Sequence, residues 1–235
     1  MAISTNPLAW LRSVQPRRAI ALLLLLLPLT VGAQTVRDLW LSMPPSLAPY
    51  LSTSLRTQCL DFYDMHTDAQ TDNALKGKSR IDTLTSTFLA ATLSKAHTLQ
   101  MKLLPASGSG LGSYMVSGSS SSLSSCDSVL CVVRSWDGPK RDSEVQLFDR
   151  QWKPLQAPLT FSADSFVCRP DTMSEERFSR LVAMLDPIMF SVSLSPVENV
   201  LLVKLSPVVP NPEDEKAIEQ ILVQRKLKWD GKTFK

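Results

Sequence analysis

The stretch GKSRIDTLTSTFLAATLSKAHTLQMKLLP, residues 77–105, decides the fold class of this chain. Near its end, Leu99, Met101 and Leu103 alternate with polar residues. A period of two is typical of a strand that buries one face. A short turn at 94–96 would make its two flanking strands antiparallel neighbours. The stretch predicts three strands, at 79–85, 87–93 and 97–104.

Helical patterns precede this stretch, and a further sheet follows it. We expect helices over 46–51 and 54–65, because apolar residues of the second piece recur at helical spacing. Downstream, 129–136 is apolar at nearly every position, as expected of a strand covered on both faces, and 144–148 returns beside it. The run 106–125 is dominated by Gly and Ser and is predicted to be a mobile loop.

The last third repeats the order of helix first and strands after. Thr172 and Glu175 form a predicted capping box for a helix that Pro187 ends. A hairpin over 188–205 follows it. Asn211 then predicts another helix cap, and a final strand ends in a tight turn at Asp230-Gly231.

These elements predict an α+β fold, in which helices pack on one face of antiparallel sheets. We expect a single domain over 34–235 with sub-halves 34–160 and 170–235. Because 46–155 and 173–235 share the order of helix and strands, a diverged tandem repeat is an open alternative to one continuous unit.

The first 33 residues have the pattern of an export signal. An apolar run, 19–29, precedes small residues and a predicted cleavage between Ala33 and Gln34. As a helix, 19–33 would rise only about 22 Å, whereas a bilayer core is about 30 Å thick. We therefore expect a periplasmic or secreted protein without a transmembrane helix after cleavage. The basic residues before the run are Arg12, Arg17 and Arg18.

Charge argues against a nucleic-acid partner. The whole chain has 25 basic and 22 acidic residues, and all three excess charges lie in the predicted signal. Cleavage would leave a chain of zero formal net charge, whereas nucleic-acid binders usually carry a basic face.

The cysteines leave disulfide pairing open. Cys126 and Cys131 would lie about 16 Å apart in one extended strand, beyond the roughly 7 Å that a disulfide allows, so they pair only if the chain turns between them. Buried free thiols are the alternative, and the spacing matches no zinc pattern. The four cysteines are Cys59, Cys126, Cys131 and Cys168.

One cluster of residues could bind a divalent cation. Carboxylates and a histidine close in sequence can supply oxygen and nitrogen ligands. The spacing matches no calcium loop, and a solvated acidic helix end explains the cluster equally well. The cluster consists of Asp61, Asp64, His66, Asp68 and Asp72.

Signs of catalysis are weak. His66 and His97 are the two histidines, and no G-x-S-x-G motif accompanies them. His97 shares the predicted buried face of its strand with Leu99 and Met101, which favours a structural role. We therefore assign no catalytic, cofactor-binding or metal-binding residue. The basic tail, 225–232, is interpreted as an amphipathic strand, with binding to an anionic surface as the alternative.

Several short motifs are spread along the chain after the predicted signal. They are DLWLSMPPSLAPYL (38–51), R-x-x-C-L-D-F (56–62), N-x-L-x-G-K-S (73–79), TLQMKLLP (98–105), D-S-x-V-x-L-F-D-x-x-W-K-P-L (142–155), FSVSLSPVENVLLVKLS (190–206) and KWDGKTF (228–234). Together these motifs resemble an exported family of Bacteroidales-type bacteria, catalogued as domain of unknown function 3256. The resemblance covers essentially the whole chain after the signal and implies an envelope location in a Gram-negative cell and an α+β fold. It implies no site residue, and the Ser-rich 117–125 departs from the family pattern.

From these observations we expect a non-catalytic envelope protein that binds a protein or glycan partner. The alternative is a hydrolase acting on an envelope or dietary polymer. An assembly factor is a third class.

Overall fold

The computed structural model describes residues 34–106, 128–155, 159, 161–209 and 211–235. The predicted signal, the loop beyond Ala106 and Cys126 therefore lie outside the described residues. The helices are α2 (Val36–Ser42), α3 (Thr53–Asp64), the 3₁₀ helix η3 (Ala163–Phe166), α4 (Glu175–Ala183) and α5 (Pro212–Glu219). The strands are β1 (Thr71–Asp72), β2 (Lys78–Leu84), β3 (Phe88–Ser94), β4 (His97–Pro105), β5 (Ser128–Asp137), β6 (Arg141–Phe148), β7 (Pro154–Leu155), β8 (Phe190–Leu194), β9 (Val200–Leu205) and β10 (Arg225–Lys228).

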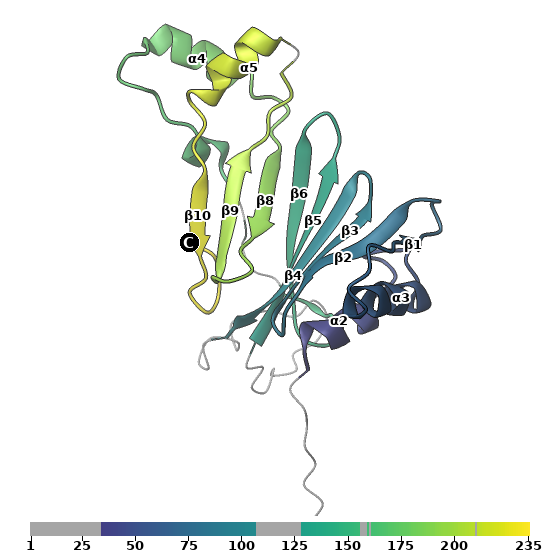
Figure 1. The fold of residues 1–235 in the computed structure, drawn as a ribbon. Coiled ribbons are helices and arrows are strands. Elements are labelled where there is room, and N and C mark those ends of the chain that lie inside the picture. The colour runs from purple at the N-terminus through teal and green to yellow at the C-terminus, as the bar shows by residue number, and fades with distance from the viewer. Residues whose placement is uncertain (1–33, 107–127, 156–158, 160, 210) are drawn as a thin grey trace, which may run out of the picture. The chain divides into compact units, whose positions relative to one another are not determined.

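The strands form two antiparallel sheets (Figure 1). The larger sheet has seven strands in the order β1 to β7, so that each strand pairs with its neighbours in sequence. The smaller sheet has the order β10-β9-β8. Met101 of β4 lies opposite Leu89 of β3 and Val132 of β5, which fixes the register of the central strands. The predicted α+β fold is confirmed.

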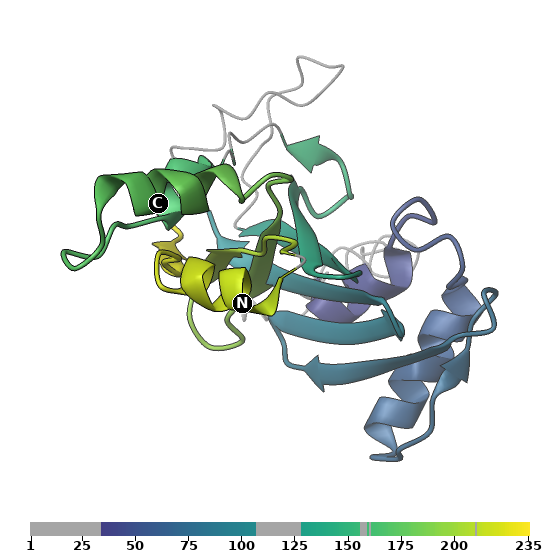
Figure 2. The same cartoon turned by 90° about the horizontal axis from the view of Figure 1, so that it is seen from above.

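The seven-stranded sheet is covered on both faces. Figures 1 and 2 place α2 and α3 on one side of it, and the small sheet with α4 and α5 on the other. Along β5, Leu130 and Val132 belong to the hydrophobic cluster on the helix side, whereas Cys131 and Val133 belong to the cluster on the other side. This double burial confirms the expectation for 129–136.

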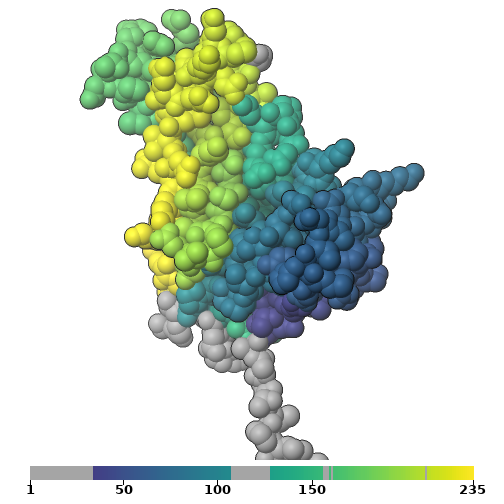
Figure 3. Space-filling view, in the orientation of Figure 1, coloured from purple at the N-terminus to yellow at the C-terminus, as the bar shows by residue number. Residues whose placement is uncertain are grey.

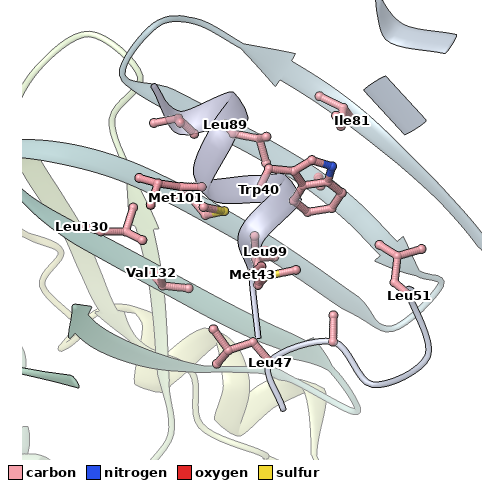
Figure 4. Packing of buried hydrophobic residues seen from close by; sticks show 14 of the residues in the cluster. Trp40, Met43, Leu47, Leu51, Ile81, Leu89, Leu99, Met101, Leu130 and Val132 are labelled. Carbon is pink, nitrogen blue, oxygen red and sulfur yellow. The ribbon is translucent and has the colours of Figure 1, made fainter. Parts of the chain in front are cut away.

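The helix-side core is organised around Trp40 of α2. Its side chain is fully buried among residues that include Leu89 and Met101 (Figure 4). The helix begins in a capping box formed by Thr35 and Asp38, which satisfies N–H groups of its first turn. Sequence analysis did not recognise this short helix, although it anchors the core.

Arg56 of α3 joins the two N-terminal helices. Its side chain is only 3% exposed and lies among backbone carbonyls rather than beside an acid. It donates to the carbonyl oxygens of Met43 (2.6 Å) and Leu41 (3.2 Å) at the end of α2. In return, Trp40 Nε1 donates to the carbonyl of Arg56 at 3.0 Å. Arg56 thus satisfies carbonyls that the end of a helix leaves without partners.

The two sheets are joined through polar side chains at the edge of β8. The N–H of Val192 donates to Ser143 Oγ of β6 (3.1 Å), and the N–H of Leu194 donates to Gln100 Oε1 of β4 (2.7 Å). The seven-stranded sheet thereby supplies the acceptors that another strand would otherwise provide.

A buried lysine holds the turn that follows β8. Lys102 of β4 is 2% exposed, and its Nζ donates to the carbonyls of Ser195 (2.6 Å) and Glu198 (2.7 Å). Burial lowers the pKa of Lys102, because the charged form is poorly solvated there. The turn between β8 and β9 is thus attached to the large sheet.

Two of the predicted helices differ from the structure. Residues 46–51 form turns rather than a helix, because Pro49 lies inside the segment, lacks an N–H group and clashes with the preceding turn of a helix. Helix α4 is capped by Ser174 instead of Thr172, and it ends at Ala183 before reaching Pro187. Asn211 and its helix are confirmed.

The C-terminal strand and turn are also confirmed. Gly231 has φ 96°, a conformation that glycine adopts easily, and the N–H of Thr233 donates to Asp230 Oδ1. Within the ranges that the structure describes, both parts of the chain place a helix before antiparallel strands. The division into sub-halves stays a prediction.

The described cysteines carry free thiols. Cys59 and Cys131 are buried, and Cys168 is exposed. In the described part of the chain, no helix has the length and apolar character needed to cross a membrane.

Candidate functional site

The structure does not gather the five residues of the predicted cation cluster into one site. Asp64 accepts from Arg37 Nη1 of α2 at 2.8 Å, and this hydrogen bond lowers the pKa of the Asp64 carboxyl. Asp72 forms an ion pair with Lys78 across the β1–β2 pair at 2.6 Å. No group of three His, Cys, Asp or Glu side chains suited to a metal occurs among the residues described. The geometry therefore favours the solvated acidic helix end.

His66 and Asp68 do lie together at a cleft of about 460 Å³. One wall is the end of α3 and the loop after it, and the other is β2. The cleft also contains Arg80 and Asp82, which form an ion pair at 2.7 Å. Asp82 Oδ2 also accepts from the hydroxyl of Thr92 at 2.7 Å. Because Asp82 is already engaged by two partners, it is poorly suited to proton transfer.

His97 lies elsewhere, at the start of β4. It is 7% exposed and lies on the helix side of the sheet, with Leu99 and Met101, as the alternation of this strand predicted. Burial, with a further effect of Arg134, lowers its pKa to about 4. Burial raises the pKa of Tyr50 to about 12. The protonated hydroxyl of Tyr50 and the neutral ring of His97 are therefore joined by a hydrogen bond at Nδ1.

The His97 ring supports an exposed tryptophan. Trp136 of β5 stacks on it with centroids 5.1 Å apart and planes 9° apart. The guanidinium of Arg134 lies over the Trp136 ring, 5.4 Å from its centroid. Trp136 remains 39% exposed. His97 and Arg134 thus hold the ring of Trp136 at the surface.

Polar residues of β6 complete what we call the Trp136 surface. By register, Asp142 lies opposite Trp136, and Glu144 lies opposite Arg134. Arg134 Nη2 donates to Glu144 Oε2, and Gln146 Nε2 donates to Glu144 Oε1, each at 2.6 Å. The Trp136 surface comprises Arg134, Trp136, Asp142, Glu144 and Gln146.

Sequence reasoning missed this surface. Arg134 and Trp136 lie on the same face of β5 as the buried Leu130 and Val132. They lie further along the strand, past the part of the sheet that α2 and its flanking turns cover. A tryptophan that follows an arginine by two positions, just before a turn, was the available signal. The partner strand that supplies Glu144 could be inferred only from the hairpin register.

Comparison with protein families shows to which family the chain is related. The model of the family described as protein of unknown function (DUF3256) matches residues 28–118 and 119–234, which together span most of the sequence. The chain belongs to the DUF3256 family. The family predicted from the motifs is therefore confirmed.

The DUF3256 chain also resembles a solved structure, described as a domain of an uncharacterized protein from Porphyromonas gingivalis W83. The two share 21% sequence identity with a TM-score of 0.61, and the match covers 85% of this chain and 96% of that one. At this identity the likeness shows a common fold. The search of curated proteins found no relative.

Proposed function

We propose that this DUF3256 chain is an exported binding protein, and that its Trp136 surface holds a neutral glycan. The observation that carries the proposal is the supported, exposed ring of Trp136. Stacking on His97 fixes the orientation of the ring before any ligand arrives. A preorganised ring loses little conformational freedom on binding, which favours affinity.

The surroundings of Trp136 favour a glycan over a protein. The core of a protein interface is apolar, whereas Trp136 is flanked by Arg134, Asp142 and Glu144. A sugar ring can present apolar C–H groups to the part of the Trp136 ring that His97 and Arg134 leave exposed, and hydroxyls to the polar groups around it. The other exposed large hydrophobic residues of the described chain come from other elements, namely Met65, Leu75, Ile188 and Val197.

The charges favour a neutral glycan. Arg134 is paired with Glu144, and Arg141 is paired with Asp137 at 2.6 Å. An anionic glycan would also have to approach the exposed Asp142. Hydroxyl groups can instead donate to the carboxylates and accept from the guanidinium groups.

The same geometry gives the hydrolase alternative little support. His97 is buried and neutral, and its Nδ1 is already hydrogen-bonded to the hydroxyl of Tyr50. His66 lines the cleft beside β2 and does not join His97 in one site. General acid–base catalysis needs a base within reach of the substrate proton.

The export part of the proposal is supported by the basic and apolar leader, for which cleavage between Ala33 and Gln34 is predicted. The expected location is periplasmic or secreted. Expression of the whole chain in a Gram-negative host, followed by N-terminal sequencing, should give a chain that begins at Gln34. Recovery of the uncleaved chain in the cytoplasm would contradict export.

Glycan binding is tested by calorimetry. The chain from Gln34 would be titrated with neutral oligosaccharides of glucose, mannose, galactose and N-acetylglucosamine. We expect one of these to bind, and Trp136→Ala to weaken that binding at least tenfold. Val197→Ala removes another exposed apolar side chain, on the β8–β9 turn, and should leave binding unchanged.

Two results would contradict this proposal. One is the absence of binding to every sugar of the panel, and the other is equal binding by Trp136→Ala. Release of shorter sugars in the same samples, lost in His66→Gln or His97→Gln, would favour the hydrolase instead.

A further inference from the structure

Strand β2 has an open edge. On one side it pairs with β3 from Arg80 to Leu84. On the other side β1 pairs only with Lys78 and Ser79. Beyond Ser79, this side of β2 therefore has no strand partner in the described ranges. An unpaired strand edge offers N–H and C=O groups to an incoming chain.

The cleft of about 460 Å³ follows this edge. Three consecutive β2 residues, Arg80, Ile81 and Asp82, line it from the sheet side. Residues 66–69 and the end of α3 line it from the other side. Its volume is typical of ligand pockets, which range from about 300 to 1,000 Å³. This region lies at the surface, among the blue atoms of Figure 3.

The wall opposite β2 is fixed before any ligand binds. The N–H of His66 donates to the Tyr63 carbonyl (3.0 Å), and the N–H of Thr67 donates to the Phe62 carbonyl (3.2 Å). These two bonds form the Schellman arrangement that ends many helices. His66 occupies its left-handed position with φ 51°, where glycine is usual.

The open edge has a defined length. At one end β1 occupies it, as far as Ser79. At the other end the hydroxyl of Tyr63 accepts from the N–H of Leu84 at 3.1 Å. The free part therefore spans Arg80 to Thr83. A bulge between Ile81 and Thr83 interrupts it, so a long flat strand would not fit, but a short segment would.

The charges of the cleft favour a basic ligand. Arg80 is held by Asp82, which leaves Asp68 as a carboxylate without an ion pair in the described structure. The cleft also adjoins the C-terminal end of α3, where the helix dipole is negative. A lysine or arginine side chain in the cleft would thus meet favourable charge.

We propose that this cleft binds a short extended peptide segment, which carries a lysine or arginine and adds to β2 as a further strand. In this mode, main-chain hydrogen bonds to the strand edge give affinity, and the cleft selects the side chain. The site is separate from the Trp136 surface, so the two proposals can fail independently.

The test is fluorescence anisotropy with a labelled hexapeptide of alternating threonine and valine around one lysine. We expect saturable binding to the chain from Gln34. Asp68→Lys should weaken binding of this peptide about tenfold and should strengthen binding of the same peptide with glutamate in place of lysine. Trp136→Ala should bind the lysine peptide as the parent chain does.

Filling the cleft gives a second test with a matched control. Ala69 is exposed and lines the cleft, so Ala69→Trp should abolish binding. Ala183 is exposed on α4, and Ala183→Trp should bind normally. Melting temperatures of all variants are measured first, and the Asp68→Lys comparison decides the case if Ala69→Trp does not fold.

Methylated peptides test addition to the strand itself. N-methylation of alternate residues removes the N–H groups along one edge of the peptide. One alternate set should abolish binding and the other should leave it intact. Equal affinity of both methylated peptides would overturn the strand addition. No binding of the parent peptide, or full binding by Ala69→Trp in its folded form, would overturn the site.

Discussion

Protonation of His97 should destabilise the fold as the pH falls. The ring is buried against Tyr50 and Trp136, and the guanidinium of Arg134 is near it. Its pKa is about 4 in the folded chain and ordinarily about 6.5. Between these values the unfolded chain binds a proton that the folded chain does not. The free energy of unfolding therefore decreases as pH falls from about 6.5 to about 4.

The expected magnitude follows from the two pKa values of His97. At about 1.4 kcal/mol per pKa unit, their difference corresponds to about 3 kcal/mol of stability. His97→Gln removes this titration and retains an acceptor for the Tyr50 hydroxyl. Urea denaturation of both proteins would be measured at several values between about pH 7 and pH 4. Carboxylates that titrate in both proteins cancel in the comparison.

The expected result is a stability advantage of the parent chain over His97→Gln that shrinks by about 3 kcal/mol across this range. His66, the other histidine, is exposed, so His66→Gln serves as the matched control and should follow the parent curve. A constant difference between the parent and His97→Gln would refute the reasoning, because it would mean that His97 titrates alike in the folded and unfolded chains.

Two stability predictions concern buried side chains. Leu181→Ala in α4 should lower the free energy of unfolding by about 2–5 kcal/mol, the usual range for a buried leucine. Arg180→Ala, on the exposed side of the same helix, should change it little. An unchanged melting temperature for Leu181→Ala would show that α4 is not packed. Arg56→Ala should cost about 3 kcal/mol in urea denaturation, because the carbonyls of Leu41 and Met43 lose their donor. Parental stability of that variant would contradict the role given to Arg56.

Strand periodicity predicted most of the large sheet. The alternation through Leu99 and Met101 identified the strand β4, but its indication of a single buried face was wrong, because Lys102 and Leu104 on the opposite face are buried as well. The continuous apolar run of β5 correctly indicated cover on both sides. These signals are local, because the side chains of a strand alternate between its two faces. The short turns predicted the pairing of β3 with β4 and the return of β6 beside β5, whereas the pairing of β4 with β5 was not predicted.

Helix boundaries were predicted less well where prolines and polar residues dominate. The apolar residues Leu47 and Leu51 suggested a helix. Both side chains are buried, but their residues lie in a segment of turns. In α3 the charged Arg56 is buried, so the predicted apolar stripe was only part of the packed face. Burial of Arg56 depends on carbonyls of α2, which no periodic pattern in α3 reveals.

The candidate sites were only partly predictable. His66 and Asp68 were recognised and lie at the cleft, but their opposite wall, β2, follows after the intervening β1. Tyr50 and His97 are 47 positions apart. Contacts at such separations follow from the packing of helices and turns on the sheet, which short motifs do not encode.

The polar junction at β8 has a consequence for how the two sheets assemble. Acceptors on Ser143 and Gln100 meet the N–H groups of Val192 and Leu194, which are two residues apart. A slip of the strand by one residue would turn these N–H groups away from their acceptors. The junction therefore disfavours a one-residue slip of the small sheet, and it also occupies N–H groups of β8 that would otherwise be open to a strand of a second molecule.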